Sequence, residues 1–377
     1  MDGARQGGGV NGQRATPLAL RLKERIRRDG PMPLAEYMQA CLTDPEHGYY
    51  RKRHAIGRRG DFVTAPEISQ VFGELIGLWA AVVWQQMGKP SPVGLVELGP
   101  GRGTLMKDAL RAARAVPDFR AALRVHLFEL GEALRREQEA ALAGAGVAIE
   151  WSAAIKELPD DVPTIIVANE FLDALPISQW QRGGGQWHAL QVNVNASGAF
   201  EIVQCPAGSA VEAIAAHWPV ARDGDILEAK AFAELAAHLT SLARAVPVAG
   251  LFIDYGHDDW RFGDTLQAVR GQCLEAPLSS PGEADLSSQV NFADFARQLG
   301  GSELAVDGPV TQAEFLGSLG IAERASMLMA ANPGRAGEIE TGVARLMAPY
   351  GMGTRCKAIG LRSRYLPRLP GLAGDGR

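Results

Sequence analysis

A short glycine-rich turn between a strand and a helix constrains the fold of this chain more than any other feature of its sequence. The apolar run 93–98 predicts a strand, and residues 104–114 have the spacing of a helix. Between them, the segment Glu97-Leu-Gly-Pro-Gly-Arg-Gly103 places glycines at 99, 101 and 103. Glycine lets a backbone turn tightly and approach a ligand without Cβ contacts, and the N-terminus of the next helix then faces that ligand. Gly99, Gly101 and Gly103 are therefore predicted to form a cofactor-binding loop.

Strands and helices alternate along the middle of the chain. After the glycine turn, apolar runs predict further strands at 123–128, 147–151, 164–168 and 249–254, with helical segments before or after them. Strands that alternate with helices predict a parallel sheet covered on both faces. We therefore expect an α/β fold with a Rossmann-like sheet and helices on both faces.

Two features interrupt this alternation. Residues 187–194 and 200–204 flank a polar turn that contains glycine, which predicts an inserted β-hairpin rather than a crossover. Before the first core strand, Thr64-Ala-Pro-Glu67 has the pattern of a capping box and predicts the start of a helix that runs to about residue 87. A second capping box is predicted at 311–314.

These patterns divide the chain into five segments. The polar, glycine-rich residues at the N-terminus and the short C-terminal stretch are predicted to be disordered tails. The expected segments are a tail at 1–17, an N-terminal helical segment or lid at 18–90, a core at 91–258 with an inserted hairpin at about 180–228, a helical substrate-side segment with terminal strands at 259–365, and a tail at 366–377.

Composition excludes several classes of protein. The net charge of −5 argues against a dedicated nucleic-acid binder, and no apolar run is long enough to span a bilayer. The four cysteines lie far apart and the seven histidines form no ligand motif, so no metal site is expected. The N-terminus lacks the apolar core of a secretory signal, which favours a cytoplasmic location. The oligomeric state stays open.

The glycine spacing bears on the identity of the cofactor. A dinucleotide fingerprint requires G-x-G-x-x-G, whereas here the third glycine comes one residue earlier and Glu97 precedes the turn. This spacing resembles the loop of class I methyltransferases, which bind S-adenosylmethionine. Glu129 ends the second strand, 26 residues after Gly103 (129 − 103), where an acid can accept hydrogen bonds from ribose hydroxyls. The alternation alone does not separate S-adenosylmethionine from NAD, and Glu129 has capping of the next helix as its alternative.

Polar residues follow the fourth and fifth strands. In a parallel sheet, ligands bind beyond the carboxyl ends of the strands, so Asn169, Glu170 and Asp173 are expected to face the reacting groups. If the methyl acceptor is an arginine, its guanidinium is always protonated, and carboxylates could anchor it with paired hydrogen bonds. Asp254 and Tyr255 end the fifth strand and are candidate substrate contacts. Capping of a helix or loop remains the alternative for Glu170, Asp173 and Asp254.

Several longer blocks resemble the MidA family, the bacterial relatives of a mitochondrial complex I assembly factor. They are Gly60-Asp-Phe-Val-Thr-Ala-Pro-Glu-Ile-Ser-Gln-Val-Phe-Gly-Glu74, Glu97–Leu105, Asn169-Glu-Phe-Leu-Asp-Ala-Leu-Pro176, Ile253-Asp-Tyr-Gly256, Asp264-Thr-Leu-Gln267 and Gly308-Pro-Val-Thr-Gln312. The resemblance implies a class I methyltransferase with S-adenosylmethionine as its cofactor. It also implies methylation of protein arginine, with a complex I (NADH–quinone oxidoreductase) subunit as the mitochondrial substrate.

One block departs from this resemblance. Where the family tends to have His and Asp, this chain has Gln289 and Asn291, so hydrogen bonding to a substrate remains possible at Gln289 but proton transfer does not. By analogy, the segment around Thr64 folds over the cofactor, although a capping box would explain Thr64 structurally. Two other functions stay open: an assembly chaperone that binds the cofactor with little catalysis, and an NAD-dependent oxidoreductase.

Overall fold

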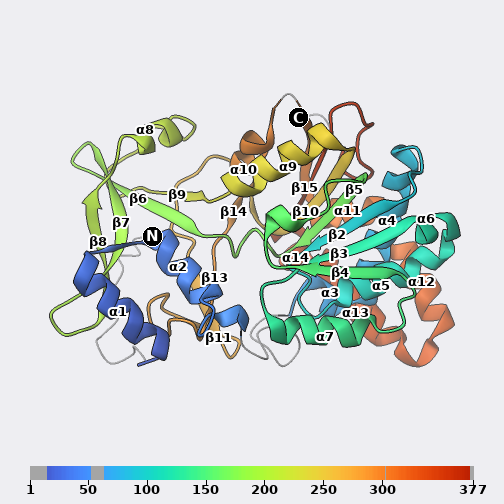
Figure 1. Cartoon of the computed structure of the whole chain (residues 1–377), viewed down its shortest axis with the longest axis horizontal. Coiled ribbons are helices and arrows are strands. Elements are labelled where there is room, and N and C mark those ends of the chain that lie inside the picture. The colour runs from blue at the N-terminus through green and yellow to red at the C-terminus, as the bar shows by residue number, and fades with distance from the viewer. Residues whose placement is uncertain (1–14, 52–62, 302, 374–377) are drawn as a thin grey trace. The chain divides into compact units, whose positions relative to one another are not determined.

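The computed structural model describes residues 15–51, 63–301 and 303–373 (Figure 1). The chain forms two compact units, each built from separate stretches of sequence. We call residues 56–173, 232–259 and 290–377 the sheet unit, and residues 1–55, 174–231 and 260–289 the insertion unit. Among the described residues, no helix combines the length and the hydropathy needed to cross a membrane.

The sheet unit is built on a mostly parallel sheet with the order β15-β16-β10-β5-β2-β3-β4. The strands are β2 (Val93–Leu98), β3 (Leu123–Phe128), β4 (Ala148–Ser152), β5 (Thr164–Asn169), β10 (Val248–His257), β15 (Leu304–Thr311) and β16 (Cys356–Ser363). The first five run parallel, whereas β16 pairs antiparallel with both β10 and β15. The short strand β14 (Val290–Asn291) joins the end of β10.

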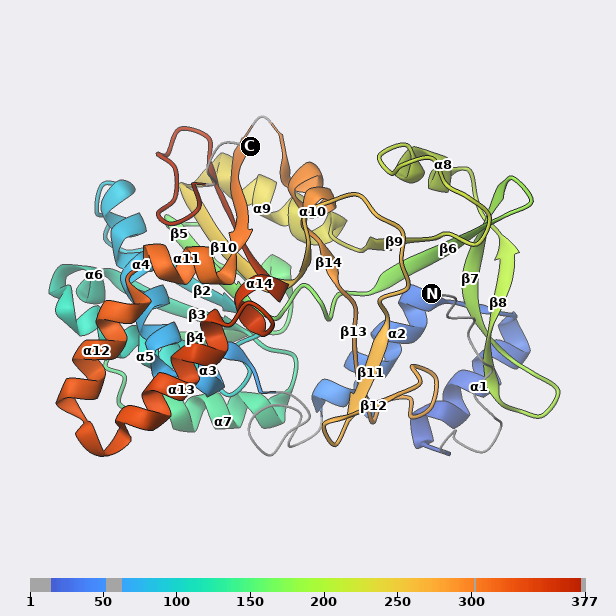
Figure 2. The ribbon, with the colours of Figure 1, turned by 180° about the vertical axis from the view of Figure 1, so that it is seen from behind.

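Helices cover both faces of this sheet, as expected (Figures 1 and 2). Successive strand residues point to opposite faces. Leu251 and Ile253 of β10 join the large core cluster that includes Trp79 of α4 (Gln70–Gln86), whereas Phe252 contacts Phe295 of α10 (Phe292–Leu299). The prediction of a Rossmann-like α/β fold is therefore confirmed. The other helices of this unit are α3 (Ala65–Ile68), α5 (Thr104–Ala112), α6 (Pro117–Ala122), α7 (Glu132–Leu142), α9 (Ala233–Ala245), α11 (Gln312–Ser318), α12 (Ile321–Ala331), α13 (Ala336–Met347) and α14 (Met352–Arg355).

Glycine residues allow α4 to lie directly against α5. A Cβ added at Gly77 would come within 2.5 Å of the Ala109 carbonyl oxygen and 2.6 Å of its Cα. We expect Gly77→Ala to lower the free energy of unfolding by about 1–3 kcal/mol, because the backbone of α5 must move away. Urea unfolding measures this loss. Gly337→Ala on α13, where the added Cβ meets nothing within 4 Å, is the matched control and should leave stability unchanged or raise it by up to about 1 kcal/mol, because alanine favours the helix. An equal effect of both substitutions would contradict the explanation.

The insertion unit contains the predicted hairpin. Strands β7 (Gln186–Val194) and β8 (Phe200–Pro206) pair antiparallel, which confirms that prediction. Several strands of this unit were missed, and two of them, β6 (Ile177–Gly183) and β9 (Ile226–Lys230), extend the same sheet. Their mixed polar sequences give no clear apolar alternation. The remaining elements are β1 (Met32–Pro33), α1 (Pro17–Asp29), α2 (Leu34–Thr43), α8 (Ala210–Ala215), β11 (Gln267–Arg270), β12 (Cys273–Glu275) and β13 (Asp285–Ser287).

The division of the chain differs from the expected one at the N-terminus. Residues 18–90 were expected to form one segment, but α1 and α2 belong to the insertion unit and α3 and α4 belong to the sheet unit. The Tyr37 and Phe200 rings meet edge to face at 5.9 Å, which shows that α2 packs on the hairpin. Contacts between segments so distant in sequence cannot be inferred from helical periodicity.

Two local predictions were wrong. The helix expected from residue 64 to 87 is broken at Ser69, whose extended backbone (φ −150°, ψ 130°) separates α3 from α4. The tail expected to be disordered from 366 is packed as far as Leu372, because Leu369 and Leu372 are buried over Gly360. Of the N-terminal tail, residues 1–14 lie outside the described residues, and Thr16 caps α1.

Candidate active site

The glycine turn after β2 has the backbone that only glycine adopts readily. Gly99, Gly101 and Gly103 have φ angles of 66°, 53° and 77°. A Cβ at Gly99 would lie 3.1 Å from the Phe171 side chain, so the loop also packs closely against the turn after β5. Gly103 is the N-cap residue of α5. The turn is thus open to a ligand and faces it with the N-terminus of a helix.

Glu97 lies under this turn and is almost completely buried, with 3% of its surface exposed. The Met106 backbone N–H donates to its carboxylate, but among the described residues Oε2 has no partner. Burial raises the pKa of Glu97 to about 8. A buried carboxylate oxygen without a partner fits a ligand that donates hydrogen bonds or carries positive charge.

Both carboxylate oxygens of Glu129, which follows β3, accept hydrogen bonds from the protein itself. Its Oε1 accepts from the Gly131 N–H at 2.6 Å, and its Oε2 accepts from Gln138 Nε2 at 2.9 Å. Gln138 Nε2 also donates to the Gly101 carbonyl at 2.7 Å and so connects Glu129 to the glycine turn. Sequence reasoning missed Gln138, because a buried glutamine within a helix has no distinguishing pattern. The ribose contact of Glu129 stays a prediction.

The ends of neighbouring strands bring the candidate catalytic residues to the same edge of the sheet. Leu98 of β2 is in register with Ala168 of β5, and Asn169 is in register with Ile253 of β10. Glu170 therefore follows β5 beside the end of β2, and Asp254 follows Ile253 on the other side. This confirms that the segments chosen from the sequence meet at the carboxyl ends of the strands.

Glu170 has an unusual backbone and a perturbed carboxylate. Its φ of 51° is left-handed, a conformation that costs energy for a residue other than glycine. Its Oε1 accepts from the Ala65 N–H at 3.0 Å and from Asn169 Nδ2 at 3.1 Å. Burial is the main cause that raises the pKa of Glu170 to about 7, and the nearby Asp173 adds to it. Within the described part of the chain, Oδ1 of Asn169 is buried without a partner.

Asp254 holds the turn that carries Glu170 and Asp173. Its Oδ2 accepts from the N–H groups of Phe171, Leu172 and Asp173 at 3.0, 2.7 and 3.1 Å, and its Oδ1 accepts from the Tyr255 N–H at 2.7 Å. Its pKa is raised, first by burial and then by Asp173 and Glu170. The pKa of Tyr255 is also raised, chiefly by burial. The geometry therefore favours loop capping for Asp254, and its substrate contact stays a prediction.

The helix start at Thr64 does not form the expected capping box. Thr64 occupies the cap position of α3, but its side chain makes no capping hydrogen bond. The Glu67 carboxylate instead accepts from the Thr104 hydroxyl at the start of α5 and lies 3.6 Å from the Arg102 guanidinium. Glu67 thus contacts the cofactor loop at Arg102 and the first residue of α5 at Thr104. The cofactor contact of Thr64 stays a prediction.

Comparisons with known proteins agree with this geometry. Residues 75–310 match a family described as putative S-adenosyl-L-methionine-dependent methyltransferases. The chain belongs to this family. The resemblance to MidA proteins inferred from the sequence is confirmed, as are the enzyme class and the cofactor, S-adenosylmethionine. The dinucleotide alternative is therefore dropped.

Relatives of this methyltransferase cover nearly its whole length. The mitochondrial protein arginine methyltransferase NDUFAF7 of Mus musculus is 33% identical, over 90% of this chain and 83% of its own length. The Drosophila melanogaster homologue is also 33% identical, over 94% and 87%. A solved structure from Burkholderia thailandensis bound to S-adenosyl-homocysteine has a TM-score of 0.84 and 26% identity, and 94% of each chain is covered.

Gln289 belongs to the insertion unit of the methyltransferase. It is exposed, and its backbone N–H donates to the Thr265 hydroxyl at 3.0 Å. Asn291, the other departure from the family pattern, caps α10 by accepting from the Asp294 N–H at 3.1 Å. A neutral side chain is sufficient for this cap. The substrate contact of Gln289 stays a prediction.

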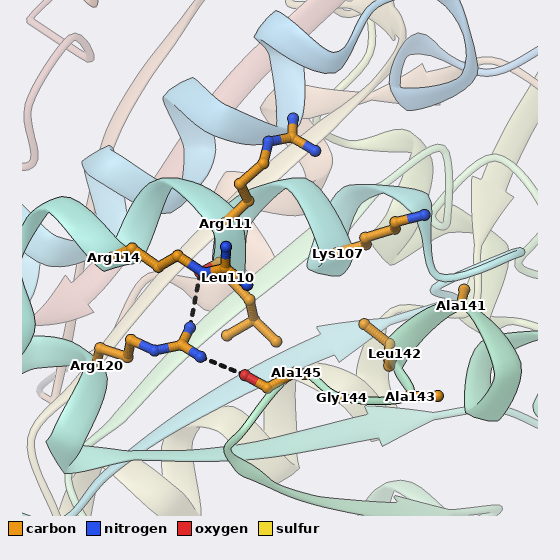
Figure 3. Close-up of a pocket in the computed structure, with 10 residues that line it drawn as sticks. All are labelled: Lys107, Leu110, Arg111, Arg114, Arg120, Ala141, Leu142, Ala143, Gly144 and Ala145. Carbon is orange, nitrogen blue, oxygen red and sulfur yellow. Dashed lines mark hydrogen bonds between the residues drawn. The ribbon is translucent and has the colours of Figure 1, made fainter.

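A pocket of about 150 Å³ lies between α5 and α7 of the methyltransferase (Figure 3). Its lining includes Lys107, Arg111, Arg114 and Arg120. The Arg120 guanidinium donates to the Leu110 carbonyl at 2.9 Å and to the Ala145 carbonyl. The residues of α5 that line this pocket begin at Lys107, whereas the glycine turn precedes Thr104, the first residue of that helix. It is therefore separate from the candidate active site.

The buried carboxyl of Glu97 predicts a pH dependence of stability in the cofactor-free methyltransferase. Its pKa is about 8 in the folded protein against an ordinary value of 4.5. Between these values the folded state retains a proton that the unfolded state has lost, so Glu97 makes stability fall as the pH rises, by at most about 1.4 kcal/mol per pH unit.

We expect Glu97→Gln to reduce this slope, because glutamine does not titrate. Glu170 and Asp254 also have raised pKa values and make stability fall with pH in the same way. The quantity to compare is therefore the slope of unfolding free energy against pH in the variant and in the wild type. Urea unfolding at pH 5.5 and 7.5 measures it. Glu132→Gln, at an exposed position on α7, is the control, and equal slopes in wild type and Glu97→Gln would contradict the assignment.

Proposed function

We propose that this methyltransferase transfers the methyl group of S-adenosylmethionine to an arginine side chain of a protein. The observation that carries the proposal is the pair of carboxylates Glu170 and Asp173, which follow β5 beside the glycine turn on a segment held by Asp254. Relatives of similar length are named protein arginine methyltransferases, which supports the choice of substrate. A respiratory complex I subunit as the substrate and a cytoplasmic location are part of the proposal.

The residues present fit the cofactor. In this proposal Gly99, Gly101 and Gly103 cup its amino-acid part, Glu97 supplies the buried acceptor, and Glu129 lies near its ribose. When bound, S-adenosylmethionine supplies a methyl group on a positively charged sulfur, which is open to attack by a nucleophile. The left-handed glycines let the backbone approach such a ligand closely.

The acidic residues act on the substrate. An arginine guanidinium is protonated at all accessible pH values and presents donors that carboxylates can accept in pairs. Glu170 and Asp173 bind and orient it, and Asn169 contributes its amide. The attacking nitrogen forms a bond to the methyl carbon, the electron pair of the broken carbon–sulfur bond stays on sulfur, and the nitrogen loses one proton. Glu170, with a pKa of about 7, is suited to accept that proton.

The test is methyl transfer from labelled S-adenosylmethionine into a lysate that lacks this protein, followed by hydrolysis and amino-acid analysis. Label in methylarginine from one protein band supports the proposal and identifies the substrate. Label only in small molecules would point to a metabolite methyltransferase. Cofactor binding without any transfer, also in a single-turnover format, would favour an assembly chaperone.

A further inference from the structure

Helix α3 lies between the cofactor loop and the candidate catalytic carboxylate. At its first residue, the Ala65 N–H donates to Glu170 Oε1 at 3.0 Å. Two residues later, Glu67 accepts from the Thr104 hydroxyl and pairs with Arg102, which belongs to the glycine turn. All of these residues belong to the sheet unit. A single short element therefore contacts both halves of the site.

Helix α3 needs tertiary contacts to stay in place. It has only four residues, Ala65–Ile68, and a helix of one turn has no stability of its own. On one side it packs against α13, where a Cβ at Gly342 would lie 3.0 Å from the Ile68 carbonyl oxygen. On the other side the contact to α5 is made by Glu67.

The Glu67 contact is well placed to be strong. Its side chain is only 12% exposed, and its carboxylate lies at the N-terminus of α5, where the helix dipole favours negative charge. Hydrogen bonds to charged groups are stronger than neutral ones. The sequence suggested a capping role for Glu67 within α3, but the structure shows that it connects α3 to a different helix.

We propose that Glu67 is a positioning residue that holds α3 against the start of α5 and thereby keeps the Ala65 N–H on the Glu170 carboxylate. The inference rests on the proposed function, since Glu170 is treated as the group that acts on the substrate. Loss of Glu67 frees the N-terminal end of α3 and lets water reach Glu170.

The groups around Glu170 determine how its pKa changes when α3 moves away. The charged and titratable groups that face it are Asp173, Asp254, Tyr255, Cys356 and Arg345. Burial is the largest cause of its raised pKa, and the Ala65 N–H opposes that rise. Because entry of water removes the larger effect, the pKa of Glu170 should fall toward its ordinary value when α3 moves away.

The experiment compares Glu67→Ala with Glu137→Ala in the full-length protein. Glu137 accepts from Arg102 at 3.0 Å, as Glu67 pairs with Arg102, but it belongs to α7 rather than to α3. Hydrogen exchange of the Ala65 amide is measured without substrate. We expect exchange about tenfold faster or more in Glu67→Ala, from the loss of a hydrogen bond to a charged group, and unchanged exchange in Glu137→Ala.

The pH dependence of kcat is the second measurement. In Glu67→Ala at saturating cofactor, the apparent pKa of kcat should move down from about 7, whereas Glu137→Ala should match the wild type. Glu67→Gln keeps an acceptor for the Thr104 hydroxyl and should recover part of the wild-type exchange rate. Thr104→Val removes the partner on α5 and gives an independent variant if Glu67→Ala folds poorly.

The results distinguish a positioning role of Glu67 from the alternatives. Unchanged Ala65 exchange in both Glu67→Ala and Thr104→Val would overturn the proposal. Weaker binding of S-adenosyl-homocysteine with unchanged exchange and pH profile would overturn it too, by making Glu67 a cofactor ligand. If the wild-type protein transfers no methyl group but Ala65 exchange responds as expected, the proposed function fails and the link between Glu67 and Glu170 stands.

Discussion

Gly101→Val should abolish binding of S-adenosylmethionine while the protein remains folded. Gly101 has a φ of 53°, which a β-branched side chain adopts only with strain, and its carbonyl accepts from Gln138 Nε2 at 2.7 Å. The valine side chain would also stand where the backbone approaches the ligand. We expect the affinity to fall by roughly a hundredfold or more, about 2.7 kcal/mol, measured by calorimetry with S-adenosyl-homocysteine.

The matched control for this variant is Gly144→Val. Gly144 also has a positive φ, of 77°, but a Cβ there meets nothing within 4 Å, and the residue follows the C-terminal end of α7. The Gly144→Val substitution therefore imposes comparable backbone strain at a position away from the cofactor loop. Thermal unfolding should shift by similar amounts in the two variants, and only Gly101→Val should lose cofactor binding. Unchanged affinity in Gly101→Val would remove the glycine turn from the cofactor site.

Glu170→Gln should lower turnover much more than cofactor affinity. Glutamine keeps the size of the side chain and one acceptor for the Ala65 N–H, but it cannot accept a proton from the substrate. We expect kcat to fall by roughly 10²–10⁴-fold, the usual contribution of a positioned general base, while binding of S-adenosyl-homocysteine changes little. The measurement is steady-state methyl transfer alongside calorimetry.

The pH profile gives a second check on Glu170. Only the ionised carboxylate can take up a proton, so the wild-type rate should rise with pH through about 7, the pKa of Glu170, and level off above it. Glu170→Gln should lack this rise. If turnover and cofactor affinity fell by the same factor, Glu170 would belong to the cofactor site instead.

The central sheet and its loop could be predicted from the sequence because their signals are local. The strand before Gly99, the left-handed glycines and the polar residues after β5 lie in short segments with characteristic composition. In a parallel sheet these strand ends then lie at the same edge, where ligands bind. The capping box at Thr311 is also confirmed, since Thr311 and Glu314 bond reciprocally.

The features that could not be predicted from the sequence depend on contacts between distant segments. Glu67 was expected to cap its own helix, but its partner Thr104 is 37 residues further along. Asp254 was left open between substrate binding and capping, and its contacts to residues 171–173 become visible only when β5 and β10 are paired. Gln138 was missed for the same reason, since its partners lie on two other loops.

The discontinuous make-up of the insertion unit has a consequence for synthesis of the chain. Thr16 donates to the Pro281 carbonyl at 2.8 Å, across 265 residues of sequence, and Tyr37 packs on Phe200. Ribosomes add about 5–20 residues per second, so α1 and α2 wait on the order of ten seconds to a minute before their partners emerge. During this time their apolar faces are uncovered, which makes the nascent N-terminal segment a natural client for chaperones that act at the ribosome.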